Sequence, residues 1–119
     1  MNLLLRGFLD LLYPPRCEAC GRLRREALCA ECLAAIERIE RPLCEVCGEA
    51  FDPLAQAAPR CAECRARRRP FLLARTAAFY HGPLADAIRR FKYHGQVVLA
   101  RPLGRIMLEA LSGSAADLD

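Results

Sequence analysis

Four Cys-x-x-Cys pairs constrain the fold of this chain more than any other feature, and they hold all eight cysteines. In chain order the pairs are Cys17/Cys20, Cys29/Cys32, Cys44/Cys47 and Cys61/Cys64. Two residues between paired thiols let both sulfurs reach one tetrahedral metal ion from a single tight turn. Eight sulfurs complete two four-cysteine sites, so the sequence predicts two Zn²⁺ ions as cofactors. Four thiolates also suit iron, which stays an alternative.

An internal repeat indicates how the pairs share the metal. The pattern Cys-Glu-x-Cys-Gly occurs at Cys17–Gly21 and at Cys44–Gly48, and Cys-Ala-Glu-Cys follows at Cys29–Cys32 and Cys61–Cys64. The repeat favours sequential pairing, in which the first two pairs hold one ion and the last two hold the other. The alternative is the cross-braced pattern of RING-like modules, in which the first and third pairs share an ion. The glycine after each second cysteine is typical of a zinc knuckle, where the chain needs a left-handed residue.

The cysteine-rich segment has few other means of folding. Apolar residues are sparse between Cys17 and Pro70, and a segment of about fifty residues cannot build much core alone. We therefore expect zinc to supply the folding free energy and the metal-free form to be largely unfolded. The second copy of the repeat has a longer loop, containing Pro53 and Pro59, which we expect at the surface.

The cysteine spacing also bears on location and chemistry. Residues 2–12 are interrupted by Arg6 and Asp10 and lack a cleavage site, so they do not resemble a secretory signal. They are also too short for a membrane span, which needs roughly 20 apolar residues. Paired cysteines without a secretion signal indicate a cytoplasmic metal protein. Cys-x-x-Cys also occurs in oxidoreductases, but four pairs with knuckle glycines favour zinc.

Two helices are expected in the first part of the chain. Residues 2–12 place apolar side chains at helical spacing, with Asn2 as a cap and Pro14 as the stop. We expect this helix to pack on the second half of the chain; the alternative is a partner-binding or membrane-surface helix. A second, short helix is expected over Ala30–Glu40, ended by Pro42.

The part of the chain after Pro70 lacks cysteines and is expected to form regular secondary structure. We expect a strand over Leu72–Tyr80, an amphipathic helix over Leu84–Tyr93 ended by Gly95, and a further helix over Val97–Leu111. The residues expected to face a core from the last helix are Val98, Leu103, Ile106, Met107 and Leu111.

Positive charge is concentrated in residues 65–106, which hold ten basic residues against Asp86 alone. Such a surface attracts phosphates or nucleic acid, and the alternative is a solvated arginine-rich face. The candidate phosphate-binding residues are Arg65, Arg67, Arg68, Arg69, Arg89, Arg90 and Lys92. Tyr80 and Tyr93 are candidates for stacking on bases. His81 and His94 lie beside glycines, where we expect turn roles and no metal ligation or catalysis.

The whole pattern resembles the N-terminal half of the ComF family. The resemblance rests on the paired knuckles together with Ala78–Leu84, Ile88–Gly95 and Leu99–Gly104. Members of that family join a double zinc ribbon to a type I phosphoribosyltransferase-like domain. They act in the cytoplasm during natural competence, on incoming single-stranded DNA, with helicase-like and DNA-processing partners.

The resemblance implies a small zinc-stabilised α+β fold. In this reading an N-terminal helix (1–15) precedes a double zinc ribbon (16–65), and 70–119 supply a strand and two helices from an incomplete α/β phosphoribosyltransferase-like domain. The implied function is that of a competence-associated zinc-ribbon module that binds DNA or a partner protein in DNA uptake.

One departure from the family affects the expected activity. A type I phosphoribosyltransferase holds its diphosphate sugar with an acidic pair followed by a Thr/Gly-rich loop. This chain has no such stretch, and its late acids are Glu109, Asp117 and Asp119. We therefore expect a chain truncated relative to the family, without catalytic residues and inactive alone. The alternative function is a non-autonomous fragment of a phosphoribosyltransferase-type enzyme.

Overall fold

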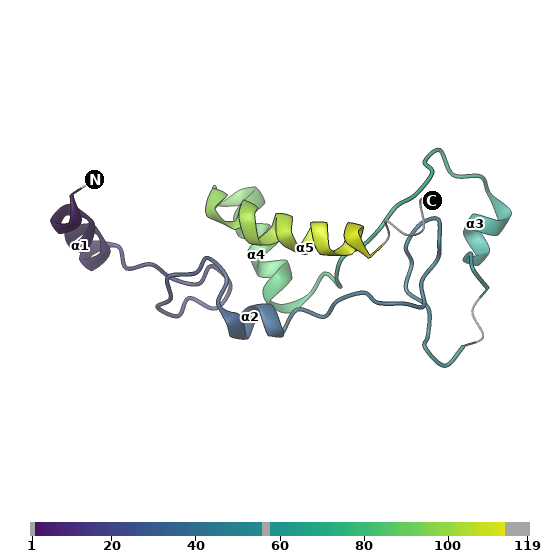
Figure 1. The fold of residues 1–119 in the computed structure, drawn as a ribbon, viewed down its shortest axis with the longest axis horizontal. Helices are drawn as coiled ribbons and strands as arrows, with labels where there is room; N and C mark the ends of the chain where they lie inside the picture. The colour runs from purple at the N-terminus through teal and green to yellow at the C-terminus, as the bar shows by residue number, and fades with distance from the viewer. Residues whose placement is uncertain (1, 56–57, 114–119) are drawn as a thin grey trace. The chain divides into compact units, whose positions relative to one another are not determined.

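The structure is a computed structural model that describes residues 2–55 and 58–113. Within these residues the regular elements are helical, and Figure 1 shows their order along the chain. They are α1 (Leu3–Leu12), α2 (Ala30–Ala34), α3 (Ala62–Ala66), α4 (Gly82–Tyr93), the 3₁₀ helix η1 (Val97–Leu99) and α5 (Ala100–Ser112). None of the helices in this part of the chain has the length and apolar character needed to cross a bilayer.

The chain divides into two compact units. One comprises residues up to Ile36 together with Tyr80–Leu103, and contains the first two cysteine pairs. The other comprises Glu37–Phe79 with the described residues from Gly104 onward, and contains the last two pairs. Each four-cysteine site therefore lies within a single unit. The predicted division at residues 65–70 stays a prediction.

The core of the first unit is built around its cysteines. Leu28 and three cysteine side chains are buried together with Ala87 of α4 and Leu99 of η1. α4 packs against both α2 and η1. The sparse apolar content of the ribbon is thus supplemented by small and aliphatic side chains from residues about sixty positions further along the chain.

Helix α1 ends at Leu12, as the following prolines predict. Asn2 occupies the N-cap position, but its side chain makes no capping hydrogen bond. The expected packing of this helix on the second half of the chain is not found, because no residue of α1 is buried. Leu4 and Leu11 keep more than four-fifths of their surface exposed.

The expected helix Ala30–Glu40 is wrong in length, because α2 ends at Ala34. The residues after it use their backbone groups elsewhere. Ile39 N–H donates to the carbonyl oxygen of Ala77 at 3.1 Å, and Phe79 N–H donates to that of Glu37 at 3.0 Å. This antiparallel pairing needs extended backbone, which a continuing helix would not provide.

The strand expected over Leu72–Tyr80 is reduced to the same short pairing. Only an isolated antiparallel bridge, Arg38 with Ala78, is formed in this stretch. Two further isolated bridges, Arg16 with Leu23 and Leu43 with Ala50, lie in the ribbons. The described residues form helices and isolated bridges, and none of them form a strand longer than a single bridge. The α+β class and the phosphoribosyltransferase-like part are therefore not confirmed.

The last two helices follow the predicted order with shifted bounds. α4 begins at Gly82, flanked by His81 and His94, and Gly95 ends it with φ of 65°. The region expected as one helix from Val97 is a 3₁₀ turn followed by α5.

The side chains buried in this region differ from the expected set. Of the five expected core-facing residues, Ile106 is buried and Leu103 is half-buried, whereas the other three are exposed. Leu99, which was not expected in the core, is fully buried. For Val98 and Leu99 the reason is local, because η1 has three residues per turn and places its side chains away from α-helical positions.

The loop expected between the third and fourth cysteine pairs is exposed at Leu54 and Ala55. Its residues 56–57 lie outside the described residues, as do the chain's last six, 114–119.

Candidate metal centre

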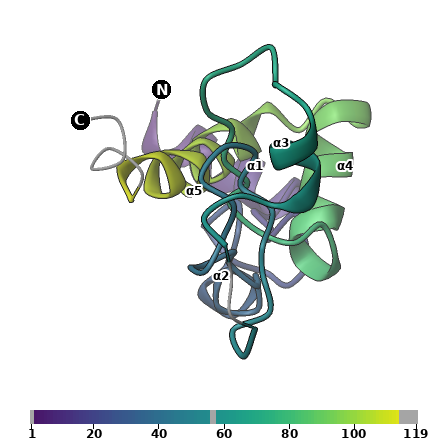
Figure 2. The ribbon, with the colours of Figure 1, turned by 90° about the vertical axis from the view of Figure 1, so that its right-hand side faces the viewer.

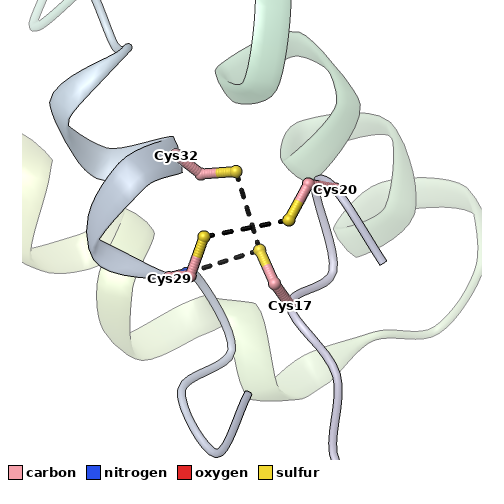
Figure 3. Close-up of side chains that lie close together, drawn as sticks. All are labelled: Cys17, Cys20, Cys29 and Cys32. Atoms are coloured by element: carbon pink, nitrogen blue, oxygen red, sulfur yellow. Dashed lines mark hydrogen bonds between the residues drawn. The ribbon is translucent and has the colours of Figure 1, made fainter. Parts of the chain in front are cut away.

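The first site gathers four sulfurs from a turn and a helix end. Cys17 and Cys20 come from one turn, whereas Cys29 is the N-cap of α2 and Cys32 lies within it. Figure 3 shows all four side chains pointing toward one another. Their sulfurs lie within 4.8 Å of each other. The Sγ–Sγ distance is 3.7 Å for Cys17–Cys32 and 3.8 Å for Cys20–Cys29.

The second site repeats this arrangement. Cys44 and Cys47 come from a turn, Cys61 is the N-cap of α3, and Cys64 lies in that helix, which is labelled in Figure 2. The four sulfurs again lie within 4.8 Å of each other, and Cys47 and Cys61 are 3.7 Å apart.

Both sites fit a tetrahedral zinc ion. A Zn–S bond of about 2.3 Å gives a tetrahedron whose edges measure about 3.8 Å, which matches the sulfur separations. The cysteines group sequentially, so the cross-braced alternative is excluded. Two sites of four cysteines therefore hold two zinc ions.

The repeat extends to the backbone of the two turns. Gly21 N–H donates to Cys17 O at 2.9 Å, and Gly48 N–H donates to Cys44 O at 3.0 Å. Both glycines are left-handed, with φ of 75° and 76°. This confirms the predicted knuckles, because an ordinary residue at such a φ is strained.

Backbone amides also stabilise the first thiolate of each site. Cys29 N–H donates to Cys17 Sγ, and Cys61 N–H donates to Cys44 Sγ, both at 3.3 Å. Burial raises the pKa of Cys17 and Cys44, but the backbone N–H groups outweigh it and lower each pKa to about 6. Each site thus favours one thiolate near neutral pH, which assists capture of a cation.

The two sites differ in what covers the knuckle. At the second site, residues 74–76 run across Gly48, and Ala74 N–H donates to the Val46 carbonyl oxygen at 2.7 Å. A Cβ built on Gly48 would lie 2.8 Å from the Ala74 carbonyl oxygen. At the first site, a Cβ on Gly21 would have nothing within 4 Å.

The second site also has a guanidinium at its sulfurs. Arg69 Nε donates to Cys64 Sγ at 3.5 Å, and its Nη2 lies 3.1 Å from Oε2 of Glu63. The Cys64 sulfur and the Glu63 carboxylate raise the pKa of Arg69. Four thiolates around one Zn²⁺ leave two negative charges, which this arginine partly compensates.

The basic residues expected to bind phosphates divide between the two units. In the second unit Arg65, Arg67 and Arg68 are exposed, whereas Arg69 is held by the metal site.

In the first unit, the Arg90 guanidinium on α4 pairs with the Glu18 carboxylate of the first knuckle at 2.7 Å. Arg89 pairs with Asp86 at 3.3 Å and lies 5.8 Å from the centre of the Tyr80 ring. Lys92 and Tyr93 are exposed.

Two residues of an open cavity beside the second site were missed by the sequence reasoning. The cavity measures about 360 Å³, and Arg60 and Phe71 line it together with Arg68. Arg60 directly precedes a ligand cysteine, and Phe71 directly follows the basic run and Pro70. An aromatic residue bordering a basic run was the available indication for Phe71.

Comparison with known proteins places this geometry in a domain family. Residues 8–65 match the family model of the double zinc ribbon domain. Both four-cysteine sites lie inside the matched segment, so this part of the chain is a double zinc ribbon domain. Neither a search of curated proteins nor a search of solved structures found a significant match. The match does not reach residues 70–119, whose resemblance to ComF stays a prediction.

Proposed function

We propose that this double zinc ribbon is a structural module that recruits single-stranded DNA in a ComF-like, competence-associated protein of the cytoplasm. Competence helicase-like or DNA-processing proteins would be its partners. The zinc ions serve folding, because four sulfurs fill a tetrahedral shell and leave no position for a substrate. The function is therefore binding, through surfaces that the zinc sites hold in place.

The cavity beside the second site carries this proposal. Its lining combines the guanidinium groups of Arg60 and Arg68 with the ring of Phe71, which is 41% exposed. Arginines bind the phosphates of a single strand, and an exposed ring offers a face on which a base stacks. Arg65 and Arg67 extend the exposed positive charge along the same stretch of chain.

The proposal predicts strongly salt-dependent binding of an oligothymidylate to the zinc-loaded chain. For single strands the slope of log K against log salt is about −0.7 per phosphate contact, so four arginines give about −3. Fluorescence anisotropy of a labelled oligonucleotide across a salt series measures this slope.

A pair of charge-matched variants localises the contact. Replacing Arg67 and Arg68 with alanine removes two contacts and reduces the steepness of the slope by about 1.4. The control replaces Arg22 and Arg25, exposed arginines of the first ribbon, and removes the same charge. Binding without salt dependence, or equal losses in both variants, would refute recruitment through this cavity.

A second candidate is a non-autonomous part of a phosphoribosyltransferase-type enzyme. It is supported by the ComF resemblance and by α5, on which Met107 and Leu108 are each 64% exposed and Leu111 is 54% exposed. Another polypeptide segment would cover these side chains. On this proposal the chain alone has no affinity for phosphoribosyl diphosphate, and calorimetry that detects such binding contradicts it.

A further inference from the structure

The internal repeat allows one ribbon to be compared with the other, position by position. The two knuckles share their backbone hydrogen bonds and left-handed glycines. They differ because the second is covered by an extended segment of its own unit, residues 74–76, whereas Gly21 in the first has open space. The segment that covers the second knuckle therefore indicates what kind of segment fits the first.

The contact at the second knuckle is made mainly by backbone. Ala74 N–H donates to the Val46 carbonyl oxygen at 2.7 Å, which is the contact of an added β-strand. The absence of a side chain on Gly48 permits it, because a Cβ there would lie 3.1 Å from the Cα of Arg75. Arg75 Nη1 then donates to the Glu45 carbonyl oxygen at 3.0 Å.

The first knuckle has the same features without the segment. Ala19 and Glu18 occupy the positions of Val46 and Glu45, and Gly21 occupies that of Gly48. No described residue donates a hydrogen bond to the Ala19 carbonyl oxygen. Cys20 and Gly21 are exposed, whereas Cys47 is half-buried and Gly48 is buried. Ala87 of α4 packs against the buried cysteines of this site, whereas nothing lies within 4 Å of a Cβ built on Gly21.

The covered knuckle indicates the occupant. Charge does not distinguish the two sites, because the first also has arginines beside it, Arg24 paired with Glu31 at 3.0 Å and Arg90 paired with Glu18 at 2.7 Å. The second knuckle accepts a backbone N–H donor followed by an arginine, so a peptide segment of the same kind is favoured over a nucleic acid, which has no peptide N–H to donate.

We infer that the first knuckle, Cys17–Gly21, is a docking site for an extended segment of a partner protein. The segment presents a small residue followed by arginine. Its small residue donates a backbone hydrogen bond to the Ala19 carbonyl oxygen, and its arginine reaches the Glu18 carbonyl oxygen. This surface and ligand differ from those proposed for DNA, so either proposal can fail without the other.

The test uses the zinc-loaded full chain and a synthetic peptide with the sequence of Phe71–Ala78. We expect the peptide to shift the amide NMR resonances of Cys20 and Gly21 in a saturable way. A peptide methylated on the nitrogen of the residue matching Ala74 loses the donor, so it should bind at least about fivefold more weakly.

Two matched glycine variants locate the site. Gly21→Asn keeps a residue that tolerates the left-handed conformation but places a side chain where the segment would lie. It should abolish the shifts. Gly95→Asn is the control, because Gly95 is also left-handed at 65° with nothing within 4 Å of its Cβ position. It should bind the peptide like the unmodified chain.

Several outcomes would overturn the inference. These are shifts at Gly48 without shifts at Gly21, equal binding by the methylated peptide, and retained binding by Gly21→Asn. Shifts of Gly21 that depend on protein concentration alone would assign the knuckle to a second copy of this chain. Shifts produced by an oligonucleotide and not by the peptide would assign it to nucleic acid.

Discussion

Replacing Gly48 with alanine should detach residues 74–76 from the second knuckle, whereas Gly21→Ala should leave them in place. The two glycines form a matched pair, with φ of 76° and 75°, each following the second cysteine of its knuckle. The added methyl group meets the Ala74 carbonyl oxygen at 2.8 Å in one case and nothing within 4 Å in the other. Comparing the two variants therefore separates backbone strain from the clash.

The magnitude can be worked out from these contacts. A left-handed alanine costs about 1–2 kcal/mol at either position. At Gly48 the neighbouring atoms belong to backbone, so the segment must move away. It then loses the hydrogen bonds from Ala74 N–H and from Arg75 Nη1, each worth about 1 kcal/mol net. Gly48→Ala should thus destabilise the attachment of the segment by about 2 kcal/mol more than Gly21→Ala does.

Hydrogen exchange of the Ala74 amide is the direct assay, since that N–H is bonded to Val46 O in the native structure. About 2 kcal/mol corresponds to about a 30-fold loss of protection at Ala74 in Gly48→Ala. Gly21→Ala, measured with zinc at the same concentration, should leave this amide as protected as in the unmodified chain. Equal protection of Ala74 in the two variants would refute the packing of the segment on the knuckle.

Further predictions concern the metal sites. Cys17→Ser and Cys44→Ser should each reduce the zinc content from two ions to one per chain, because each removes a buried ligand of a different site; elemental analysis of purified protein measures this. Arg69→Ala should lower the zinc affinity of the second site by about 10-fold to 100-fold, since partners of the ligand atoms contribute that much. In the same chelator competition, Arg22→Ala should leave the zinc affinity unchanged. Cys20, the one exposed ligand of the eight, should be alkylated by iodoacetamide before the others, as peptide mass spectrometry of the zinc-loaded chain would show; faster labelling of Cys44 would contradict the burial pattern.

The metal sites could be predicted from the sequence because their ligands are local. Two cysteines separated by two residues share a turn, and the repeat shows which turns belong together. The ends of α1 and α4 could be predicted for the same reason, since Pro14 and Gly95 act on their own backbone. Each of these predictions needed only neighbours within one turn or one repeat.

The predictions that failed concern contacts between distant segments. The helix after Cys29 is shorter than expected because Glu37 and Ile39 bond to Phe79 and Ala77. The ion pair of Arg90 with Glu18, far away in sequence, was likewise not expected, and the role of Arg90 in phosphate binding stays a prediction. Periodicity in one segment carries no information about the segment that will lie against it.

The sequence by itself therefore determined the two zinc sites, their ligands and their similar turns, because tetrahedral coordination and left-handed glycine are local requirements. Only the tertiary structure decided that the sites are unequal. A backbone segment and an arginine from further along the chain cover the second site, while the first leaves Cys20 and Gly21 exposed. The physical reason is that a buried surface depends on which residues meet in space, and two nearly identical motifs acquired different neighbours.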